Sequence, residues 1–244
     1  MLIPKPNDAI HKVWLLRLLT AIADHPQLGQ IFYFKGGTCA AMRGWLDRFS
    51  VDLDFDLRIE KKDLPRIRIE LEKFFLDLGL EVKDSSKNTI QYFLKYKNDK
   101  GDRNTIKLDA LIPPPKSNKY EQVNLADIDR TMWCQTKETM FANKLVALID
   151  RYKKTGQIAG RDLYDIYVFF FKGFNYEGKV IEERTNKKAK DFLKELILFI
   201  EKNITQTIIN QDLNFLLPDK EFQEIRKTLK TEAIMLIRDE IKRL

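Results

Sequence analysis

One segment largely decides the fold that the sequence predicts: FYFKGGTCAAMRGWLDRFSVDLDFDLRI, Phe32 to Ile59. It opens with an aromatic run, continues with a glycine pair and ends with three aspartates that alternate with apolar residues. Residue preferences predict a short buried strand over residues 31–35, a glycine turn, a helix over residues 38–46 and a strand over residues 51–59. The segment therefore predicts a strand, a turn, a helix and an acidic strand in succession.

The acidic strand has one apolar face and one carboxylate face. Successive side chains of a strand point to opposite faces, so Asp52, Asp54 and Asp56 share a face at spacings of about 6 to 7 Å. Carboxylates this close repel one another unless a cation intervenes, and Mg²⁺ prefers oxygen ligands. We interpret Asp52 and Asp54 as metal ligands and Asp56 as a solvated or structural residue. The alternative is an acidic surface that nearby Lys and Arg side chains neutralise.

The glycine turn is a candidate phosphate site. Gly36 and Gly37 would present bare backbone N–H groups at a helix start, and Thr38 is a suitable N-cap for that helix. Glycines also occur at such turns for conformational reasons alone. Neither the P-loop pattern nor GxGxxG is present, which disfavours P-loop and Rossmann chemistry.

A third acid comes from a later strand. The segment IKLDALI, residues 106–112, places Asp109 in an otherwise apolar strand, where a charge is costly without a partner. Asp109 therefore needs a partner. A salt bridge to a neighbouring Lys is the simpler explanation, and the resemblance described below makes Asp109 the third metal ligand.

The chain divides into a mixed first half and a helical second half. We predict an α/β (α+β) fold with a mixed sheet and flanking helices, followed by an α-helical domain, and place the domains at residues 1–125 and 126–244. Further predicted elements are a helix from residue 8 to 25, a helix over 63–78, strands over 80–83, 89–97 and 104–112, and helices over 137–152, 161–172, 186–202 and 220–244.

Composition narrows the class of protein. The chain has 244 residues, 44% of them hydrophobic, and a formal net charge of +7, with a pI near 9.2. Two cysteines and two histidines form neither a disulfide framework nor a zinc site. We find no signal peptide or membrane span and expect a soluble, cytoplasmic protein. The positive charge favours an anionic partner, nucleic acid before others.

Five segments carry a resemblance to a known family. A phosphate-binding glycine turn, one short helix and a D-x-D strand resemble the polymerase-β-like core of the nucleotidyltransferase superfamily. Between residues 34 and 171, the segments stand in the order found in AbiEii/AbiGii-type nucleotidyltransferases, the toxins of type IV toxin–antitoxin and abortive-infection systems. These segments are FKGGTCAAM, RFSVDLDFDL, IKLDALI, TKETMFANKLVALIDR and GRDLYDIYVFF.

The resemblance implies a site for a nucleoside triphosphate and Mg²⁺, or Mn²⁺, between a nucleotidyltransferase domain and a helical domain. By this resemblance, Asp52, Asp54 and Asp109 would bind metal. The glycine turn, Gly36, Gly37 and Thr38, would contact phosphate, and so would Lys144. Asp162 and Asp165 would belong to the catalytic constellation, and Arg48 and Ser50 would line the pocket.

The residues of the helical half also have simpler interpretations. Lys144 lies at the edge of an apolar stripe, where lysines usually extend their ammonium groups towards water. Asp162 and Asp165 lie at a predicted helix start, where acids suit the helix dipole. Only the resemblance favours function for these three residues.

The function implied is metal-dependent transfer of a nucleotide from a nucleoside triphosphate to an acceptor hydroxyl. The basic charge suggests RNA, and the family suggests tRNA, with a cognate antitoxin as a further partner. Alternatives are transfer to a protein or small molecule, a catalytically inactive nucleic-acid-binding module on the same fold, and a metal-dependent nuclease.

Overall fold

The structure is a computed structural model that describes residues 5–98 and 103–244. The predicted turn at residues 98–102 falls almost entirely outside this range. The chain forms two compact units. The sheet unit comprises the residues up to Gly44, Phe49–Pro114 and Tyr120–Gln135, and the helical unit comprises Trp45–Arg48, Pro115–Lys119 and Thr136–Leu244.

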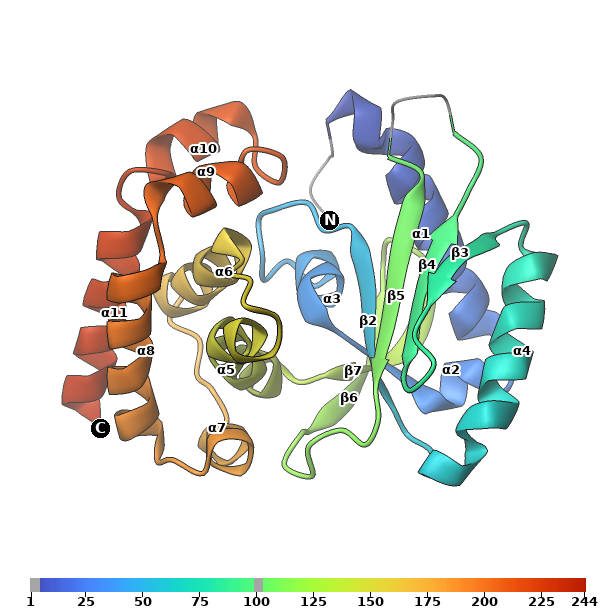
Figure 1. The fold of residues 1–244 in the computed structure, drawn as a ribbon, viewed down its shortest axis with the longest axis horizontal. Helices are drawn as coiled ribbons and strands as arrows, with labels where there is room; N and C mark the ends of the chain where they lie inside the picture. Colours follow the sequence, from blue (N-terminus) through green and yellow to red (C-terminus); the bar gives the residue numbers. More distant parts are fainter. Residues whose placement is uncertain (1–4, 99–102) are drawn as a thin grey trace. The chain divides into compact units, whose positions relative to one another are not determined.

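The sheet unit is built on one mixed sheet (Figure 1). Its strand order over the described residues is β3-β4-β5-β2-β1-β7-β6. The pairs β2–β5 and β1–β7 are parallel, and the other neighbouring pairs are antiparallel. The strands are β1 Phe32–Lys35, β2 Asp52–Leu57, β3 Glu81–Ser85, β4 Ile90–Lys95, β5 Thr105–Leu111, β6 Tyr120–Leu125 and β7 Arg130–Gln135.

Helices cover both faces of this sheet. Figure 1 shows α1 and α4 on one side of the sheet and α3 on the other. The alternating residues Leu53 and Phe55 of β2 are fully buried, and Phe55 contacts Phe32 and Phe34 of β1, so the apolar face forms the core. The helical elements are η1 Pro6–Asp8, α1 Ala9–Asp24, α2 Leu28–Ile31, α3 Gly36–Met42, η2 Lys61–Asp63 and α4 Leu64–Asp77.

The helical unit packs around α5 and α6. Thr136 caps α5 by accepting a hydrogen bond from the Thr139 backbone N–H, and Phe141 of α5 stacks on Phe169 of α6 at 5.0 Å between ring centroids. α11 packs against α6 and α8. The helices are α5 Lys137–Thr155, α6 Gly160–Phe171, α7 Gly178–Thr185, α8 Ala189–Asn203, α9 Gln206–Leu213, α10 Asp219–Ile225 and α11 Leu229–Arg243.

The predicted fold class is confirmed, and several elements differ from prediction. Strands β6 and β7 occupy a stretch expected to be a connection, and they pair with each other on either side of the expected domain boundary at residues 125/126. Helices α7 and α9 were not predicted, and the helix expected over 220–244 is divided into α10 and α11. Helix α3 begins at Gly36, so the N-cap expected at Thr38 is wrong.

Within the described part of the chain, no helix combines the length and apolar character needed to cross a membrane.

Candidate functional site

Three strands bring the acidic face of the sheet unit together. Asp54 of β2 is the register partner of Lys35 on β1 and of Asp109 on β5. Register partners on neighbouring strands point to the same face, so Asp54 lies between a lysine and a second carboxylate. Asp52 is paired in the same way with Lys107 of β5, and the side chains of Asp52, Asp54 and Asp109 are half-buried. This face thus carries two adjacent carboxylates, Asp54 and Asp109, with lysines at neighbouring positions.

Gly36 is required where the chain passes from β1 into α3. Its φ of +79° lies in the left-handed region that favours glycine. A Cβ atom at this position would lie 2.3 Å from Asp54 Oδ2, closer than any side chain can approach. Gly36 therefore lets the backbone at the start of α3 come into contact with the Asp54 carboxylate.

Thr38 and Ser50 fix the start of the acidic strand. Thr38 Oγ1 donates to the Asp52 carbonyl oxygen at 2.5 Å and lies 2.9 Å from Ser50 Oγ. Thr38 is fully buried and Ser50 is 7% exposed. These hydroxyls hold the backbone of Asp52 beside α3, and their predicted contact with a nucleotide stays a prediction.

Asp109 has two partners from neighbouring positions. Lys107 Nζ donates to Asp109 Oδ2 at 2.8 Å, and Gln91 Nε2 of β4 donates to the same oxygen at 3.0 Å. About a third of each charged side chain is exposed, 31% for Lys107 and 33% for Asp109. The salt bridge to a neighbouring Lys that sequence reasoning left open is present, and the carboxylate remains accessible.

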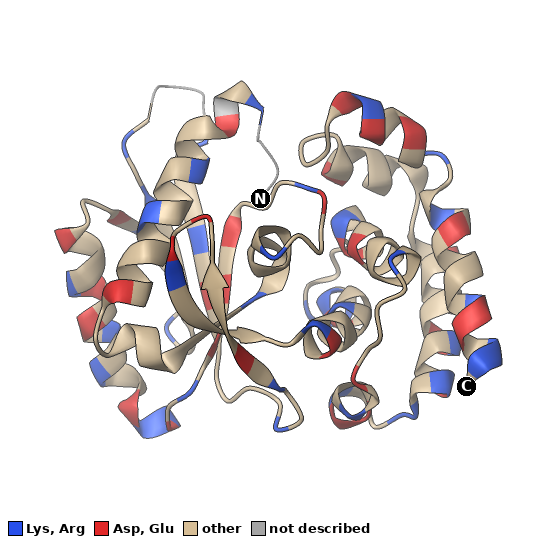
Figure 2. Ribbon diagram, turned by 180° about the vertical axis from the view of Figure 1, so that it is seen from behind, with Lys and Arg blue, Asp and Glu red and all other residues tan. Residues whose placement is uncertain are grey.

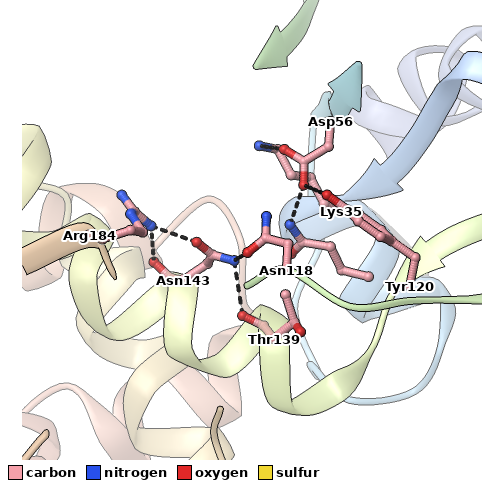
Figure 3. Close-up of polar contacts among 8 residues, drawn as sticks. Lys35, Asp56, Asn118, Tyr120, Thr139, Asn143 and Arg184 are labelled. Carbon is pink, nitrogen blue, oxygen red and sulfur yellow. Dashed lines mark hydrogen bonds and ion pairs between the residues drawn. The ribbon is translucent and has the colours of Figure 1, made fainter. Parts of the chain in front are cut away.

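Asp56 has a structural environment that differs from that of Asp52 and Asp54. It is fully buried and accepts hydrogen bonds from Lys35 Nζ at 2.6 Å, Tyr120 Oη at 2.8 Å and Gln135 Nε2 at 2.6 Å. Figure 3 shows the Lys35 and Tyr120 side chains directed at this carboxylate. Three donors satisfy the buried charge, so Asp56 holds β1, β2, β6 and β7 together.

The donors of the acidic face suit a hard divalent cation. Asp52 and Asp54 supply carboxylate oxygens on one face of β2, with the Asp109 carboxylate beside them on β5, and Mg²⁺ typically takes one or two carboxylates together with water and phosphate. In the described residues, no three His, Cys, Asp or Glu side chains are already gathered in a metal-binding arrangement. The residue types fit Mg²⁺ or Mn²⁺, and substrate phosphate would have to complete the coordination.

In the helical unit, one buried carboxylate joins two predicted site residues. Arg48 donates to Asp165 from Nε at 2.6 Å and from Nη2 at 2.7 Å, and Lys144 Nζ lies 2.6 Å from Asp165 Oδ2. Burial alone would raise the pKa of Asp165, but the charges of Arg48 and Lys144 and their hydrogen bonds lower it to about 2. The structure therefore brings Arg48, Lys144 and Asp165 into a single ion cluster.

Arg48 is buried within this cluster and bonded to Asp165. It is 3% exposed, and its pKa is raised because the charge of Asp165 outweighs the effect of burial. The paired, planar contact between guanidinium and carboxylate fixes both groups. Lys144 keeps 13% of its side chain exposed and retains access to solvent.

Asp162 has a different partner. Arg151 Nε of α5 donates to Asp162 Oδ2 at 2.9 Å, and Asp162 lies in the first turn of α6, where a carboxylate complements the helix dipole. Its side chain is 4% exposed, against 37% for Arg151. The helix-start interpretation of Asp162 is consistent with this geometry, and its catalytic role stays a prediction.

A polar chain supports α5 next to Lys144. Asn143 Nδ2 donates to Asn118 Oδ1 at 3.0 Å, and Arg184 Nη1 donates to Asn143 Oδ1 at 2.8 Å, as Figure 3 shows. Arg184 also donates to Asp150 at 2.5 Å. These contacts fix the turn of α5 that carries Lys144.

Sequence reasoning left open a neighbouring Lys as the partner of Asp109, and Lys107, two residues away on the same strand face, is that residue. It missed three other partners. Lys35, the partner of Asp56, had a usable signal because it immediately precedes the glycine pair. The other two, Gln91 and Arg151, come from the strand and the helix that precede those of their partners. Their proximity depends on strand and helix pairing that no local pattern specifies.

Comparison with known families gives one match that covers most of the chain. The family model described as nucleotidyl transferase AbiEii toxin, type IV TA system, matches residues 17–232. The comparison with curated protein sequences gave no match.

Three solved structures of bacterial proteins have a similar fold. A proposed nucleotidyltransferase from Helicobacter pylori is 19% identical, with a TM-score of 0.59 and 98% of this chain and 97% of that chain covered. JHP933, also from Helicobacter pylori, is 20% identical, with a TM-score of 0.54 and coverage of 99% and 96%. MenT4, a nucleotidyltransferase toxin from Mycobacterium tuberculosis H37Rv, is 14% identical, with a TM-score of 0.50 and coverage of 97% and 87%. At these identities the likeness establishes the fold.

Proposed function

Because the chain belongs to the AbiEii nucleotidyl transferase toxin family of type IV toxin–antitoxin systems, we propose that it moves a nucleotide from a nucleoside triphosphate to an acceptor hydroxyl on RNA. The observation that carries this proposal is the pairing of Asp54 with Asp109 across parallel strands. The glycine turn at Gly36 lies against the same Asp54 carboxylate. Phosphate-binding backbone and metal-binding carboxylates would then serve one reacting phosphate.

In the proposed reaction, the acceptor oxygen forms a bond to the α-phosphorus while the bond from that phosphorus to pyrophosphate breaks. Asp52, Asp54 and Asp109 would hold Mg²⁺ or Mn²⁺, whose charge polarises the phosphate and stabilises the leaving pyrophosphate. Asp109 also accepts the proton of the attacking hydroxyl, and Lys107 and Gln91 orient its carboxylate.

The other predicted residues bind or position. The backbone N–H groups of Gly36 and Gly37 would donate to phosphate oxygens. Thr38 and Ser50 act indirectly, because their hydroxyls hold the Asp52 backbone in place.

The family motifs also assign roles to charged residues of the helical unit. Lys144 neutralises phosphate charge, and Arg48 acts through Asp165, which fixes the Lys144 ammonium. Asp162 would be a further catalytic group, as the family motif implies.

Charge supports RNA, with tRNA as the acceptor that we favour. A net charge of +7 attracts the phosphate backbone and raises the rate of encounter with it. A cognate antitoxin follows from the type IV system to which the family belongs, and we place the activity in the cytoplasm, where tRNA and nucleoside triphosphates meet.

The acceptor can be identified by incubating the protein with each α-labelled nucleoside triphosphate, Mg²⁺, total RNA and a protein extract. We expect label on RNA of tRNA size with the wild type and a loss of at least about a hundredfold with Asp52→Asn, because removal of one group that stabilises the transition state costs about this much. Asp77→Asn is the matched control, since Asp77 is exposed on α4. Label on a protein band would support protein nucleotidylation instead, and RNA fragments formed without nucleotide would indicate a nuclease.

A further inference from the structure

A pocket lies within the helical unit, and none of the residues proposed for transfer lines it, although its residues Asp47 and Tyr164 directly precede Arg48 and Asp165 in the chain. Its volume is about 480 Å³, within the range of small-molecule sites. It is lined by residues of α6, α10 and α11, together with Asp47 and residues adjoining these helices. The lining includes Asp47, Tyr164, Tyr167, Phe171, Lys172, Glu221, Glu224 and Glu232.

The charge of this pocket is opposite to that of the chain. Four carboxylates and one ammonium group line it, although the whole chain carries +7. The ammonium group of Lys172 already bonds to Asp47 at 2.7 Å. An excess of negative charge on a basic protein favours a cationic ligand.

Two of these carboxylates are not neutralised by an ion pair within the described part of the chain. Glu221 and Glu224 are exposed, and neither forms an ion pair with any residue in the described part of the chain. Figure 2 shows acidic residues gathered on α10. Glu221 suits the first turn of that helix, but Glu224 lies in its last turn, where the dipole disfavours negative charge. Helix electrostatics therefore accounts for one of the two carboxylates.

Tyr164 adds an unpartnered polar group to the pocket wall. The residue is 7% exposed, and its hydroxyl makes no hydrogen bond with a described residue. The hydroxyl oxygen is not fully buried, and because Tyr164 lines the pocket, this oxygen can contact solvent or a ligand there. Burial raises the pKa of Tyr164, and the charges of Glu221 and Asp47 raise it further. The neutral hydroxyl can accept a hydrogen bond from an N–H group.

Aromatic rings supply the rest of the wall. The rings of Tyr167 and Phe171 stack at 5.5 Å between centroids, and Phe171 is 70% exposed. Burial raises the pKa of Tyr167 to about 12, and a hydrogen bond to Glu232 contributes to the shift. Tyr167 is therefore neutral. Exposed ring faces attract organic cations and pack against methylene groups.

We propose that this pocket binds a linear aliphatic polyamine. Its ammonium groups pair with Glu221, Glu224 and the Tyr164 hydroxyl, and its methylene segments lie on the Tyr167 and Phe171 rings. A simple metal cation would leave the aromatic wall unused, and the limited volume favours a small molecule over a folded partner.

The test is calorimetric titration of the full chain with spermidine at constant ionic strength. We expect saturable binding with a stoichiometry near one, weakened at least about tenfold in the double variant Glu221→Gln/Glu224→Gln, as the loss of two charge-assisted contacts requires. The control is Glu182→Gln/Asp191→Asn, which removes the same charge from exposed positions of the helical unit outside this pocket. It should bind within about twofold of the wild type, because distant surface charges are screened.

A second variant tests the contribution of the Tyr164 hydroxyl to binding. Tyr164→Phe keeps the ring and removes the hydroxyl, and it should weaken binding about threefold to tenfold, the effect of one hydrogen bond. The proposal is overturned if spermidine shows no saturable binding to the wild type. Equal weakening by both double variants would also overturn it, and so would binding of a lysine-rich peptide without binding of spermidine. None of these results bears on nucleotide transfer, which uses other residues.

Discussion

Asp54 on β2 and Asp109 on β5 are register partners on parallel neighbouring strands. Their side chains leave the sheet on the same face, and the strands are separated by about 4.8 Å, so two carboxylates lie side by side. On the other side of Asp54, the β1 partner is Lys35, the residue before the glycine turn. Carboxylates that would repel each other are thus gathered at one place in the sheet, and the proposed chemistry depends on this placement.

Gly36 should be replaceable only at a cost to both stability and activity. In Gly36→Ala, the added Cβ would lie 2.3 Å from Asp54 Oδ2, so α3 or Asp54 must move. We expect nucleotide transfer to fall at least about tenfold and the free energy of unfolding to fall by ~2 kcal/mol, from backbone strain and displacement together.

Gly44→Ala is the control for backbone strain alone. Gly44 has a φ of +71°, and nothing lies within 4 Å of its added Cβ. We expect it to cost ~1 kcal/mol in urea unfolding and to leave transfer unchanged. Equal losses of activity in the two variants would contradict a specific contact between Gly36 and Asp54.

Asp56 should affect stability rather than chemistry. Asp56→Ala leaves the Lys35 ammonium without its buried partner and removes the acceptor of Tyr120 and Gln135. We expect the free energy of unfolding to fall by ~3–5 kcal/mol, the cost of breaking a buried ion pair. Asp77→Ala on the surface of α4 should change it by less than ~0.5 kcal/mol. A variant as stable as the wild type but inactive would show that Asp56 takes part in the reaction.

The Asp165 cluster should make stability depend on pH in acid. The pKa of Asp165 is lowered from 3.8 to about 2, because Arg48 and Lys144 outweigh the effect of its burial. A carboxylate with a lowered pKa stabilises the folded state above its unfolded pKa. This contribution is lost as pH falls from about 4 through about 2.

The measurement compares the free energies of unfolding of the wild type and Asp165→Asn across this range. We expect the wild-type advantage to be constant above about pH 5 and to shrink by ~2 kcal/mol by about pH 2. The exposed substitution Asp191→Asn should differ from the wild type by less than ~0.5 kcal/mol at every pH. An advantage that is independent of pH would contradict the cluster.

Removal of divalent cations should abolish transfer without unfolding the protein. Asp52, Asp54 and Asp109 belong to a sheet whose core is apolar, so the fold does not depend on a bound cation. We expect no labelling in EDTA, recovery with Mg²⁺ or Mn²⁺, and unchanged circular dichroism. Full labelling in EDTA would exclude the proposed role of the three carboxylates.

Local pattern was sufficient to predict the acidic strand but not its environment. The alternation around Asp52 and Asp54 predicts their common face, and the structure confirms the strand that carries them. Asp56 has the same pattern in the sequence, yet it is buried because Tyr120 and Gln135 arrive from β6 and β7. Contacts between segments separated by more than sixty residues decide its role, and no local rule specifies them.

Each feature that the sequence did not predict has its own physical reason. Only Leu125 of the six residues of β6 is buried, so this edge strand lacks the alternation of apolar and polar residues that identifies a half-buried strand. The predicted helix over 220–244 overlooked the break between α10 and α11, which contains neither Gly nor Pro. The ion cluster at Asp165 required Arg48, which lies 117 positions away in sequence.

The most direct test of the account is transfer of α-labelled nucleotide to purified tRNA by the wild type, Asp54→Asn and Asp77→Asn under the same Mg²⁺ concentration. We expect equal labelling by the wild type and Asp77→Asn, and labelling at least about a hundredfold lower with Asp54→Asn, because its carboxylate is central to the acidic face. Equal labelling by all three proteins, or no labelling by the wild type with any of the four nucleotides, would contradict the proposed transferase.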